Sequence, residues 1–565
     1  MKTINALIVV SILILTIGCE DHLTLSPLDE PSNVTFYSNE GELILALNGV
    51  YNNTLWLNYG WNPNYFKEQL DLMTDLGFER SHGDVKAIAD GSLSSSTAAV
   101  VNTWNHFYRG ISRANNLLDN MHRAEENVPT DVYERVQAEA RFLRAFSYFY
   151  LTELYGDVAL ILEVPDTEDA MIGRTSKNEV VDQIIADLEF AAQRLPQVWS
   201  GSDQGRATSG AALALKARVA LFNERYDVAS QAAQDVMNSG VYSLYPDYET
   251  LTLYAGERSS EVIFDVPFKI GVQTSAIPRS RGPQGKGTWA LSVPSQFLVD
   301  SYEAIDGKPI DESSVYDPMN PFENRDPRLD GTIVRSQAIW GNIIYETHPD
   351  STVRRVVDAA GNIIGAEENH SVTSAFGSFT GYMWRKYVDW QDFPLEIIDS
   401  ELNFILIRYA EVLQIYAEAR IEAGNIDQSV LDAINKVRAR AYGVSLEETS
   451  EYPAVTTTDQ SELRKIIRRE RKVEFAGEGL RLFDIRRWKI AEHVMDGNFI
   501  GRPLGSYYTI TEPPVIDEYG HPNYFDESLY RIVEPRSFNT NRHYLWPIPQ
   551  PELDANDAMT QNPGY

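Results

Sequence analysis

The stretch AEARFLRAFSYFYLTELYG (residues 138–156) decides the fold of this 565-residue chain. It forms most of a segment, 131–155, whose apolar residues recur at spacings of three and four. The clearest members of this pattern are Ala138, Phe142, Ala145 and Phe149. Such a period places side chains on one face of an α-helix, and the glycine that follows the segment is a suitable C-terminal cap. We therefore predict a long helix that packs through this alanine and phenylalanine face.

Helical periodicity continues outward from this segment. Before residue 240, the same spacing predicts helices over 40–51, 100–122, 178–195, 209–222 and 226–238. Helices return from 401 and continue to 494. We define the predicted helical core by these two parts of the chain, about 39–240 and 401–494.

Two predicted helix pairs have the form of a tetratricopeptide (TPR) hairpin, with small alanines where two helices cross closely. The first is ALALKARVALF, a short NER turn and YDVASQAAQDVM (212–237), and the second is AEVLQIYAEARIEAG followed by NIDQSVLDAINKVRARA (410–441). Such pairs stack because one pair cannot bury its own apolar face. The 34-residue repeat is kept only loosely, so spacing alone leaves an irregular solenoid and an unrelated helix bundle both open. Both are mainly α.

The composition changes between about 241 and 400. Pro, Gly and Asn are frequent, and short β-like runs such as EVIFDVPF (261–268) and GNIIYET (341–347) replace the helical period. No polar low-complexity linker brackets this region, so we expect a loop-rich insertion with short β-hairpins on the helical scaffold. The tail (495–565) is rich in Pro and Tyr and is predicted to be wrapping coil.

The N-terminus carries an export and anchoring signal. The apolar run ALIVVSILILTI (6–17) has the length of a signal-peptide core and is too short to span a bilayer, which takes roughly 20 residues. The single cysteine, Cys19, ends this run as in a bacterial lipobox, although Thr16 stands where that pattern usually has Leu. We predict a signal peptide (1–18), lipidation of Cys19 and a flexible tether (19–38). Several acyl chains make such attachment stable.

Charge and cysteine content exclude several classes of protein. The 49 basic and 81 acidic residues give a net charge of −32, which disfavours binding to nucleic acid. One cysteine allows neither an intrachain disulfide nor a cysteine-rich metal site. With 43% hydrophobic residues, the chain has ample material for a large core.

The sequence lacks the common motifs of enzyme active sites. The nine histidines are scattered, and neither H-E-x-x-H nor G-x-S-x-G occurs. GPQGKGT (282–288) lacks the spacing of a phosphate loop, and GKGTWA (285–290) fits G-x-G-x-x-A without a preceding apolar strand. A glycosidase carboxylate pair is tested only by geometry, because 81 acidic residues guarantee accidental pairs. We predict no catalytic residue and no metal ligand.

Aromatic residues make up 11% of the chain, with 30 Tyr and 10 Trp. Tyr and Trp on loops offer flat apolar faces with a polar edge, which suits stacking on the C–H faces of sugar rings. Loop location singles out Trp61 and Tyr65 in WLNYGWNPNYF (56–66), Trp289, and Trp340 in a short β-like stretch. Core packing competes with ligand contact at each position. We predict these four residues as ligand contacts from loop location alone.

The chain resembles the SusD/RagB family of outer-membrane nutrient-binding lipoproteins over nearly its whole length. The motifs that carry the resemblance are YRGISRANNLLDNM (108–121), AEARFLRAFSYFYLTELYGDVALI (138–161), ALKARVALFNERYDVAS (214–230), NFILIRYAEVLQIYAEARIEAG (403–424), INKVRARAYG (434–443), LRKIIRRERKVEFAGEGLRLFDIRRWK (463–489) and HYLWPIPQPELDANDAMTQNPGY (543–565). Each motif is moderately specific. All of them in this order, behind a lipidated start, are highly specific.

The resemblance implies a TPR-like scaffold of helical hairpins in a single SusD-like domain (39–565), with a loop-rich, ligand-facing region at about 241–400. It implies a lipoprotein on the extracellular face of the outer membrane that binds oligosaccharide and delivers it to a SusC-like TonB-dependent transporter without catalysis. No cofactor is expected, and no motif supports a structural Ca²⁺. Aromatic positions vary within the family, so no binding residue is carried over from it.

Charged residues concentrate in the 463–489 motif. Five of them stand at i,i+3 and i,i+4 spacings that predict ion pairs on a helix surface: Arg468, Arg469, Glu470, Arg471 and Glu474. The patch continues with Arg481, Asp484, Arg486 and Arg487. It fits a contact with substrate or transporter, or a structural network that ties two helices together. We favour the structural network, because the family keeps this stretch whatever its ligand.

Other functions stay open beside the glycan-binding one. A peptide-binding member of the same family would bind peptides and no glycan. A surface glycoside hydrolase would release new reducing ends from a bound glycan. A structural TPR adaptor would recognise protein helices and would need few loop aromatics.

Overall fold

The computed structural model describes residues 36–57, 65–80, 83–166, 171–374, 377–393, 400–506 and 509–565. Its long helices are α2 (Glu40–Tyr51), α5 (Ala98–Asn120), α6 (Thr130–Tyr155), α7 (Lys177–Arg194), α8 (Ser209–Phe222), α9 (Tyr226–Asn238), α14 (Tyr409–Glu422), α15 (Gln428–Ala441) and α16 (Gln460–Glu474). The helices predicted before residue 240 agree with these bounds to within two residues. Side-chain caps set several starts; the Thr208 hydroxyl, for example, accepts from the Ala211 amide before α8.

Short elements fill the remainder of the described chain. The short helices are α3 (Phe66–Gln69), α4 (Gly83–Ala89), α10 (Ile277–Arg281), α11 (Gln296–Ser301), α12 (Arg328–Thr332), α13 (His370–Thr373), α17 (Arg481–Arg487), α18 (Ala491–Val494) and α19 (Gln550–Ala555). The strands are β1 (Gly77–Glu79), β2 (Val262–Val266), β3 (Ser292–Pro294), β4 (Ile333–Val334), β5 (Ile339–Trp340), β6 (Ile343–Ile344), β7 (Val353–Val357), β8 (Ile363–Glu368), β9 (Met383–Trp384), β10 (Phe404–Arg408), β11 (Gly497–Pro503), β12 (Val515–Ile516), β13 (Pro522–Asn523) and β14 (Tyr530–Arg536).

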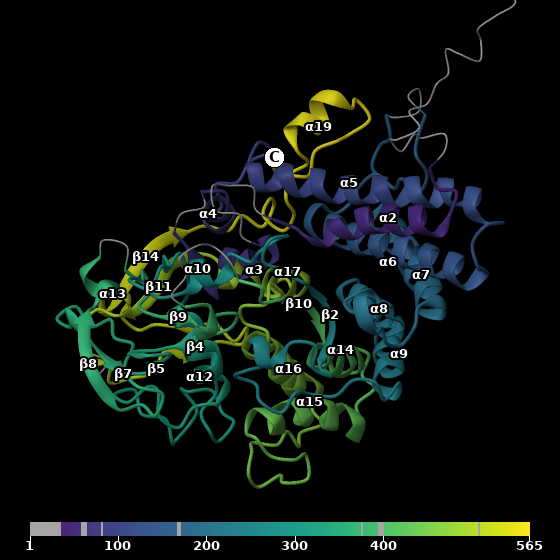
Figure 1. The fold of residues 1–565 in the computed structure, drawn as a ribbon. Helices are drawn as coiled ribbons and strands as arrows, with labels where there is room; N and C mark the ends of the chain where they lie inside the picture. The colour runs from purple at the N-terminus through teal and green to yellow at the C-terminus, as the bar shows by residue number, and fades with distance from the viewer. Residues whose placement is uncertain are drawn as a thin grey trace, which may run out of the picture.

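The helices form one continuous stack (Figure 1). Each helix from α5 to α9 packs on the next, and α14 then packs on α9 although the whole loop-rich region separates them in sequence. Helix α15 follows α14 as the second half of its hairpin. The two hairpins predicted from the sequence are therefore neighbours, and the fold is mainly α with a TPR-like arrangement, as predicted.

Helix α6 is the centre of this stack. Its predicted face is buried, with Ala138, Phe142 and Ala145 fully covered, and every other residue from Phe142 to Tyr155 is buried as well. The single apolar face predicted from the sequence is thus too narrow, because α5 and α7 flank the helix and the chain end covers its last turn. Gly156, with φ +77°, ends the helix.

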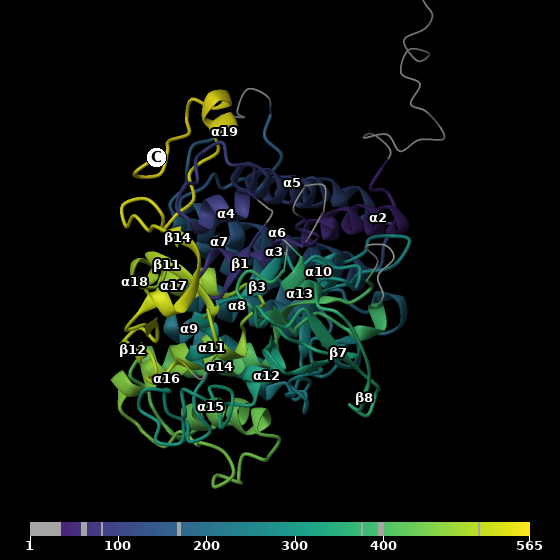
Figure 2. The same cartoon turned by 90° about the vertical axis from the view of Figure 1, so that its left-hand side faces the viewer.

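The C-terminal tail is more structured than the predicted wrapping coil. Strands β11 and β14 pair antiparallel, from Gly497 opposite Arg536 to Pro503 opposite Tyr530. The last residues then close over the end of α6, near α5 and α4 (Figures 1 and 2). The Trp546 amide donates to the Leu154 carbonyl at 2.7 Å, and the Asn562 side-chain amide donates to the Tyr155 carbonyl at 2.8 Å. The tail therefore supplies partners for the open carbonyls at the end of α6.

The loop-rich region carries small antiparallel sheets beside the helical stack. Strands β5, β6, β7 and β8 form a four-stranded sheet at the periphery of the molecule (Figures 1 and 2). The pairs β2–β10 and β4–β9 lie between this sheet and the long helices (Figure 1), and β1 pairs with β3. A hydrophobic cluster separate from the helical core fills this half of the molecule; Phe78, Val293, Trp340, Met383 and Phe499 belong to it. The loops of this half of the molecule therefore pack against a hydrophobic cluster of their own.

Candidate functional site

Two of the predicted ligand contacts lie in the core. Tyr65 is 2% exposed; its hydroxyl donates to the Thr54 carbonyl at 2.9 Å, and its ring centre lies 5.0 Å from that of Phe404. Trp340 is 1% exposed, and its ring centre lies 5.8 Å from that of Trp390. Apolar side chains cover both rings, so neither offers a face to a ligand in this structure. Loop location misled the prediction here, because packing takes both side chains inward.

The other predicted positions divide into two groups. Trp61 and the lipidation residue Cys19 lie outside the described residues, and both stay predictions. Trp289 is half-buried, on the loop that leads from α10 to β3. Among the three predicted aromatic contacts that the structure describes, Trp289 alone is partly exposed to solvent.

The backbone of Trp289 is fixed from two sides. Its amide donates to the Arg279 carbonyl at 2.9 Å. Its carbonyl accepts from Gln284 Nε2 at 2.6 Å and from Arg80 Nη2 at 3.1 Å. The guanidinium carbon of Arg279 lies 4.5 Å from the indole centre, close enough for a cation–π contact. The ring is therefore held in place before any ligand arrives.

The glycine-rich turn before Trp289 requires its glycines for conformational reasons. Gly285 and Gly287 have φ of +86° and +80°, where other residues are strained. A Cβ on Gly285 would lie 2.3 Å from Cδ2 of His370. Between the two glycines, Lys286 pairs with Glu367 of β8 at 2.9 Å. Helix α10 leads into this turn, so the match of GKGTWA to a dinucleotide fingerprint, which needs a preceding strand, is coincidental.

A second aromatic ring, which the sequence prediction missed, is connected to Trp289 through Arg80. Phe379 is half-buried and stacks on Phe78 at a centroid distance of 5.8 Å. The guanidinium carbons of Arg80 and Arg531 lie 5.6 and 5.5 Å from its centre. Arg80 therefore contacts both residues: its Nη2 donates to the Trp289 carbonyl, and its charged guanidinium lies near the Phe379 ring. A single phenylalanine in a polar loop gives no periodic signal, so only the tertiary structure could find it.

We name Arg80, Arg279, Trp289, Phe379 and Arg531 the Trp289 surface. Burial lowers the pKa of Arg80 and of Arg531, yet a guanidinium stays charged at neutral pH. The surface thus combines two partly exposed rings with fixed hydrogen-bond donors. Rings contact the C–H faces of a sugar, and guanidinium groups donate to its hydroxyls. Within the described ranges, no group of three or more His, Cys, Asp or Glu residues could hold a metal ion.

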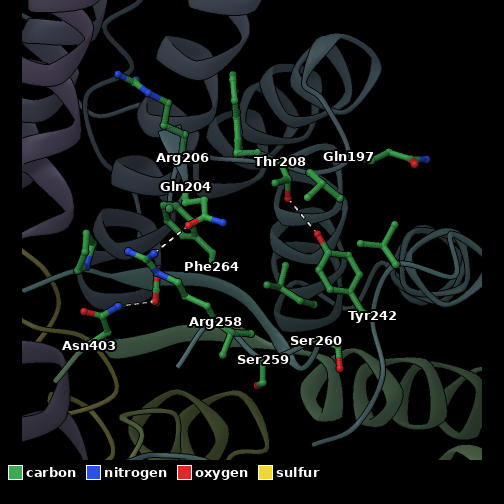
Figure 3. Close-up of a pocket in the computed structure, with 18 residues that line it drawn as sticks. Gln197, Gln204, Arg206, Thr208, Tyr242, Arg258, Ser259, Ser260, Phe264 and Asn403 are labelled. Carbon is green, nitrogen blue, oxygen red and sulfur yellow. Dashed lines mark hydrogen bonds between the residues drawn. The ribbon is translucent and has the colours of Figure 1, made fainter. Parts of the chain in front are cut away.

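A cavity lies in the helical half of the molecule, and it shares no residue with the Trp289 surface (Figure 3). It measures about 280 Å³ and lies between the loop before α8 and strand β2. Tyr242 hydrogen-bonds Thr208 at 3.0 Å on one side, and Arg258 donates to Gln204 at 2.8 Å on the other. Phe264 and Asn403 close its inner wall.

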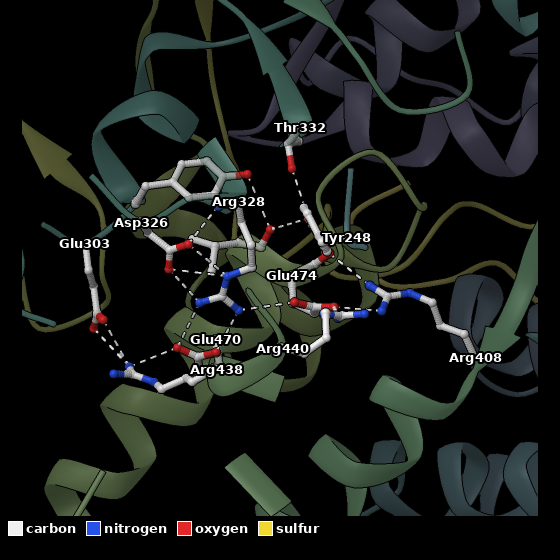
Figure 4. A network of polar contacts seen from close by, with 12 residues as sticks. Tyr248, Glu303, Asp326, Arg328, Thr332, Arg408, Arg438, Arg440, Glu470 and Glu474 are labelled. Carbon is white, nitrogen blue, oxygen red and sulfur yellow. Dashed lines mark hydrogen bonds and ion pairs between the residues drawn. The ribbon is translucent and has the colours of Figure 1, made fainter. Parts of the chain in front are cut away.

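The charged stretch of α16 forms a buried network between elements (Figure 4). Arg408, at the end of β10, pairs with Glu474 at 2.7 Å, with Glu261 at 2.8 Å and with Glu478 at 2.8 Å. Arg440 of α15 pairs with Glu261 and Glu474, and Arg328 of α12 reaches Glu474 at 3.2 Å. The predicted ion pairs along the helix surface are therefore wrong, because Glu470 and Glu474 point inward and meet arginines of other elements.

The pKa of Glu474 reports the strength of this network. Burial alone would raise it, but Arg440, Arg408 and Arg328 outweigh burial and hold the pKa of Glu474 well below its usual value. Arg328 also pairs with Glu470 at 2.9 Å. We name Glu261, Arg328, Arg408, Arg440, Glu470, Glu474 and Glu478 the Glu474 network.

The basic patch after α16 is structural, as favoured from the sequence. Arg481 pairs with Asp75 at 2.9 Å, and Arg487 pairs with Glu418 at 2.6 Å and with Asp484 at 2.9 Å. These side chains are nearly all covered and connect α17 to α14 and to the segment before β1. They offer no charged surface to a substrate or a partner. Arg486 is buried too, and burial lowers its pKa to about 10.

None of the helices in the described ranges is both long enough and apolar enough to cross a membrane.

Two family profiles match the chain. The SusD family covers residues 227–565, and a family described as starch-binding associating with outer membrane covers residues 42–221. SusD-like protein P25 of Formosa agariphila is 25% identical over 100% of both chains. A solved SusD-like carbohydrate-binding protein of Bacteroides fragilis is 30% identical, with a TM-score of 0.79 over 93% of this chain and 100% of its own. A laminarin-binding SusD-like protein shares the fold, with 21% identity and a TM-score of 0.68 over 94% of this chain and 100% of its own.

The Gly285→Ala variant tests the turn that carries Trp289. A Cβ at φ +86° and close to His370 should cost about 1–2 kcal/mol and loosen residues 282–290. Hydrogen exchange followed by mass spectrometry should show faster exchange of these amides. Gly365→Ala in β8 is the control, because its Cβ meets nothing within 4 Å. Equal exchange in both variants would contradict the assigned role of Gly285.

The Arg408→Met variant tests the Glu474 network. It leaves Glu261, Glu474 and Glu478 buried with less compensation, which should destabilise the fold by about 3–5 kcal/mol. Urea unfolding measures the loss. Arg464→Met is the matched control: it removes a partly exposed pair with Glu422, so the expected loss is about 1 kcal/mol or less. Similar losses of unfolding free energy in the two variants would show that burial does not make the Glu474 network more stabilising than a partly exposed ion pair.

Proposed function

This chain belongs to the SusD family, and we propose on that premise that it binds oligosaccharide at the cell surface. It delivers the bound sugar to a SusC-like TonB-dependent transporter in the outer membrane. The protein acts as a receptor and carries out no catalysis. The family match supports a carbohydrate ligand, since the solved relative from Bacteroides fragilis is described as carbohydrate-binding and the neighbour with the same fold as laminarin-binding.

The Trp289 surface is the observation that carries the proposal. Its ring is partly exposed on a loop whose backbone is already fixed by Arg279, Gln284 and Arg80. A preorganised ring costs little further entropy when a ligand binds. Loops on a rigid scaffold are also where binding residues usually lie. The surface therefore supports recognition of a sugar by stacking together with donation of hydrogen bonds.

The proposed anchor is a lipidated Cys19 behind the signal peptide (1–18). The tether (19–38) would hold the SusD-like domain beside the transporter, on the extracellular face of the membrane. A covalent lipid supplies the membrane attachment without a spanning helix. In this arrangement, binding raises the local glycan concentration at the mouth of the transporter.

The Trp289→Ala variant tests the ligand site. It removes the stacking face and should weaken glycan binding about tenfold or more. Affinity electrophoresis through gels that contain laminarin, starch, xylan or pectin measures the change. Tyr133→Ala on α6, also half-buried and aromatic, is the control and should bind as the wild type does.

The same panel separates the alternatives. Binding of peptides by a chain that binds no glycan would replace the sugar assignment with the peptide-binding one. New reducing ends after incubation with a bound glycan, detected by chromatography, would refute the receptor proposal and indicate a glycoside hydrolase.

The Cys19→Ala variant tests the anchor. Without the thiol no acyl chain can be attached, so the protein should leave the outer-membrane fraction. Fractionation and mass spectrometry of the mature N-terminus measure both effects. Protease added to intact cells should degrade the wild-type chain if it faces outward. An unmodified, uncleaved wild-type N-terminus in the cytosolic fraction would contradict the proposal.

A further inference from the structure

A neighbouring hollow shares part of the lining of the cavity of Figure 3. The second hollow measures about 330 Å³ and is lined in part by Tyr51, Leu55 and Ser202. The two share Gln204, Gly205, Arg206, Phe264, Asp265 and Pro267. We name these two adjacent hollows the Asp265 cleft. Together the two volumes fall in the range of small-molecule sites, about 300–1,000 Å³.

Asp265 is a buried carboxylate at the junction of the two hollows. It is 8% exposed, and burial raises its pKa. Its Oδ2 accepts one hydrogen bond from Asn403 Nδ2 at 3.0 Å. The positive charge of Arg258, on the rim, partly offsets this rise in the pKa of Asp265. A carboxylate has about four acceptor positions, so Asp265 keeps acceptor capacity for a ligand that brings hydroxyl donors.

A second polar group in the cleft also lacks a partner. The Ser259 hydroxyl oxygen is buried and has no hydrogen-bond partner in the described chain. Ser259 lines the cleft beside Ser260 and Arg258 (Figure 3). Buried polar groups are normally paired, so an unpaired hydroxyl that lines a cavity indicates a missing partner.

The charges of the cleft select the chemistry of its ligand. Arg206 and Arg258 on the rim disfavour a cation, whereas Asp265 disfavours an anion. The neutral lining groups are amides and hydroxyls, which both donate and accept, and they include Gln204 and Thr208 (Figure 3). Phe264 and Tyr242 add apolar ring surface. A neutral molecule with many hydroxyl groups and apolar C–H faces fits this set.

We propose that the Asp265 cleft is a second binding site, which takes one or two sugar units of a neutral saccharide. Sugar hydroxyls donate to Asp265 and exchange hydrogen bonds with Asn403 and Ser259. The site is independent of the Trp289 surface, because the two share no residue. Binding there does not require that the Trp289 surface be the main glycan site.

The test uses the full mature chain with Trp289→Ala as background, so that any remaining binding comes from elsewhere. The probes are laminarihexaose, maltohexaose and cellohexaose, which are neutral, and isothermal titration calorimetry measures their dissociation constants. We expect at least one probe to bind this background. Adding Asp265→Asn should then raise its dissociation constant about tenfold, because the amide keeps the shape but loses an acceptor and the charge.

A second variant blocks the cleft without touching Asp265. Ser260 is exposed at its edge, so Ser260→Trp should weaken the same probe without disturbing the core. Ser450→Trp, on an exposed turn outside the cleft, is the matched control and should leave binding unchanged. Thermal unfolding checks that each variant folds.

Binding that survives both Asp265→Asn and Ser260→Trp, or no binding of any probe to the Trp289→Ala chain, would overturn the proposal. Binding equal in the wild type and in Trp289→Ala would instead count against the Trp289 surface.

Discussion

The burial of Glu474 is the constraint on which the rest of the structure depends. Its side chain is fully covered, and an uncompensated carboxylate in that position would be strongly unfavourable. Compensation comes from Arg408 on β10, Arg440 on α15 and Arg328 on α12. These elements come from the helical stack and from the loop-rich region, so the charge balance joins the two halves. Because any one arginine alone would leave charge uncompensated, the halves must assemble together.

The scaffold and the binding surfaces follow different rules. The stack from α5 to α15 is built from repeated helix pairs whose alanines allow close approach. The Trp289 surface instead depends on single side chains from separated segments, among them Arg279 of α10 and Arg531 of β14, beside the second hydrophobic cluster. The Asp265 cleft lies within the scaffold half itself, where a helix start and a strand leave a gap. Rigid packing therefore supports both sites, although they are built from different parts of the molecule.

Much of the fold was predictable from local sequence, and much of the site was not. Helices α2, α8 and α9 matched the predicted bounds because apolar spacing is a local signal, and the capping side chains of Asn39 before α2 and Thr208 before α8 are local signals too. The inward direction of Tyr65 and Trp340 was not predictable, since the same aromatic residue in a loop can pack or face solvent. Phe379 and Asp265 carry no pattern at all; their roles arise from neighbours that are distant in the chain. Glu470 and Glu474 had a helix-surface spacing that tertiary partners overrode.

The closure of α6 by the last residues has a consequence for biogenesis. Trp546 and Asn562 satisfy carbonyls of Leu154 and Tyr155, more than 380 positions earlier in the sequence. During synthesis the N-terminal part emerges first, so the end of α6 lacks the contacts of Trp546 and Asn562 until the polypeptide is complete. The native state is therefore a product of the finished molecule, and a ribosome-stalled or C-terminally clipped fragment would be a substrate for proteolytic quality control.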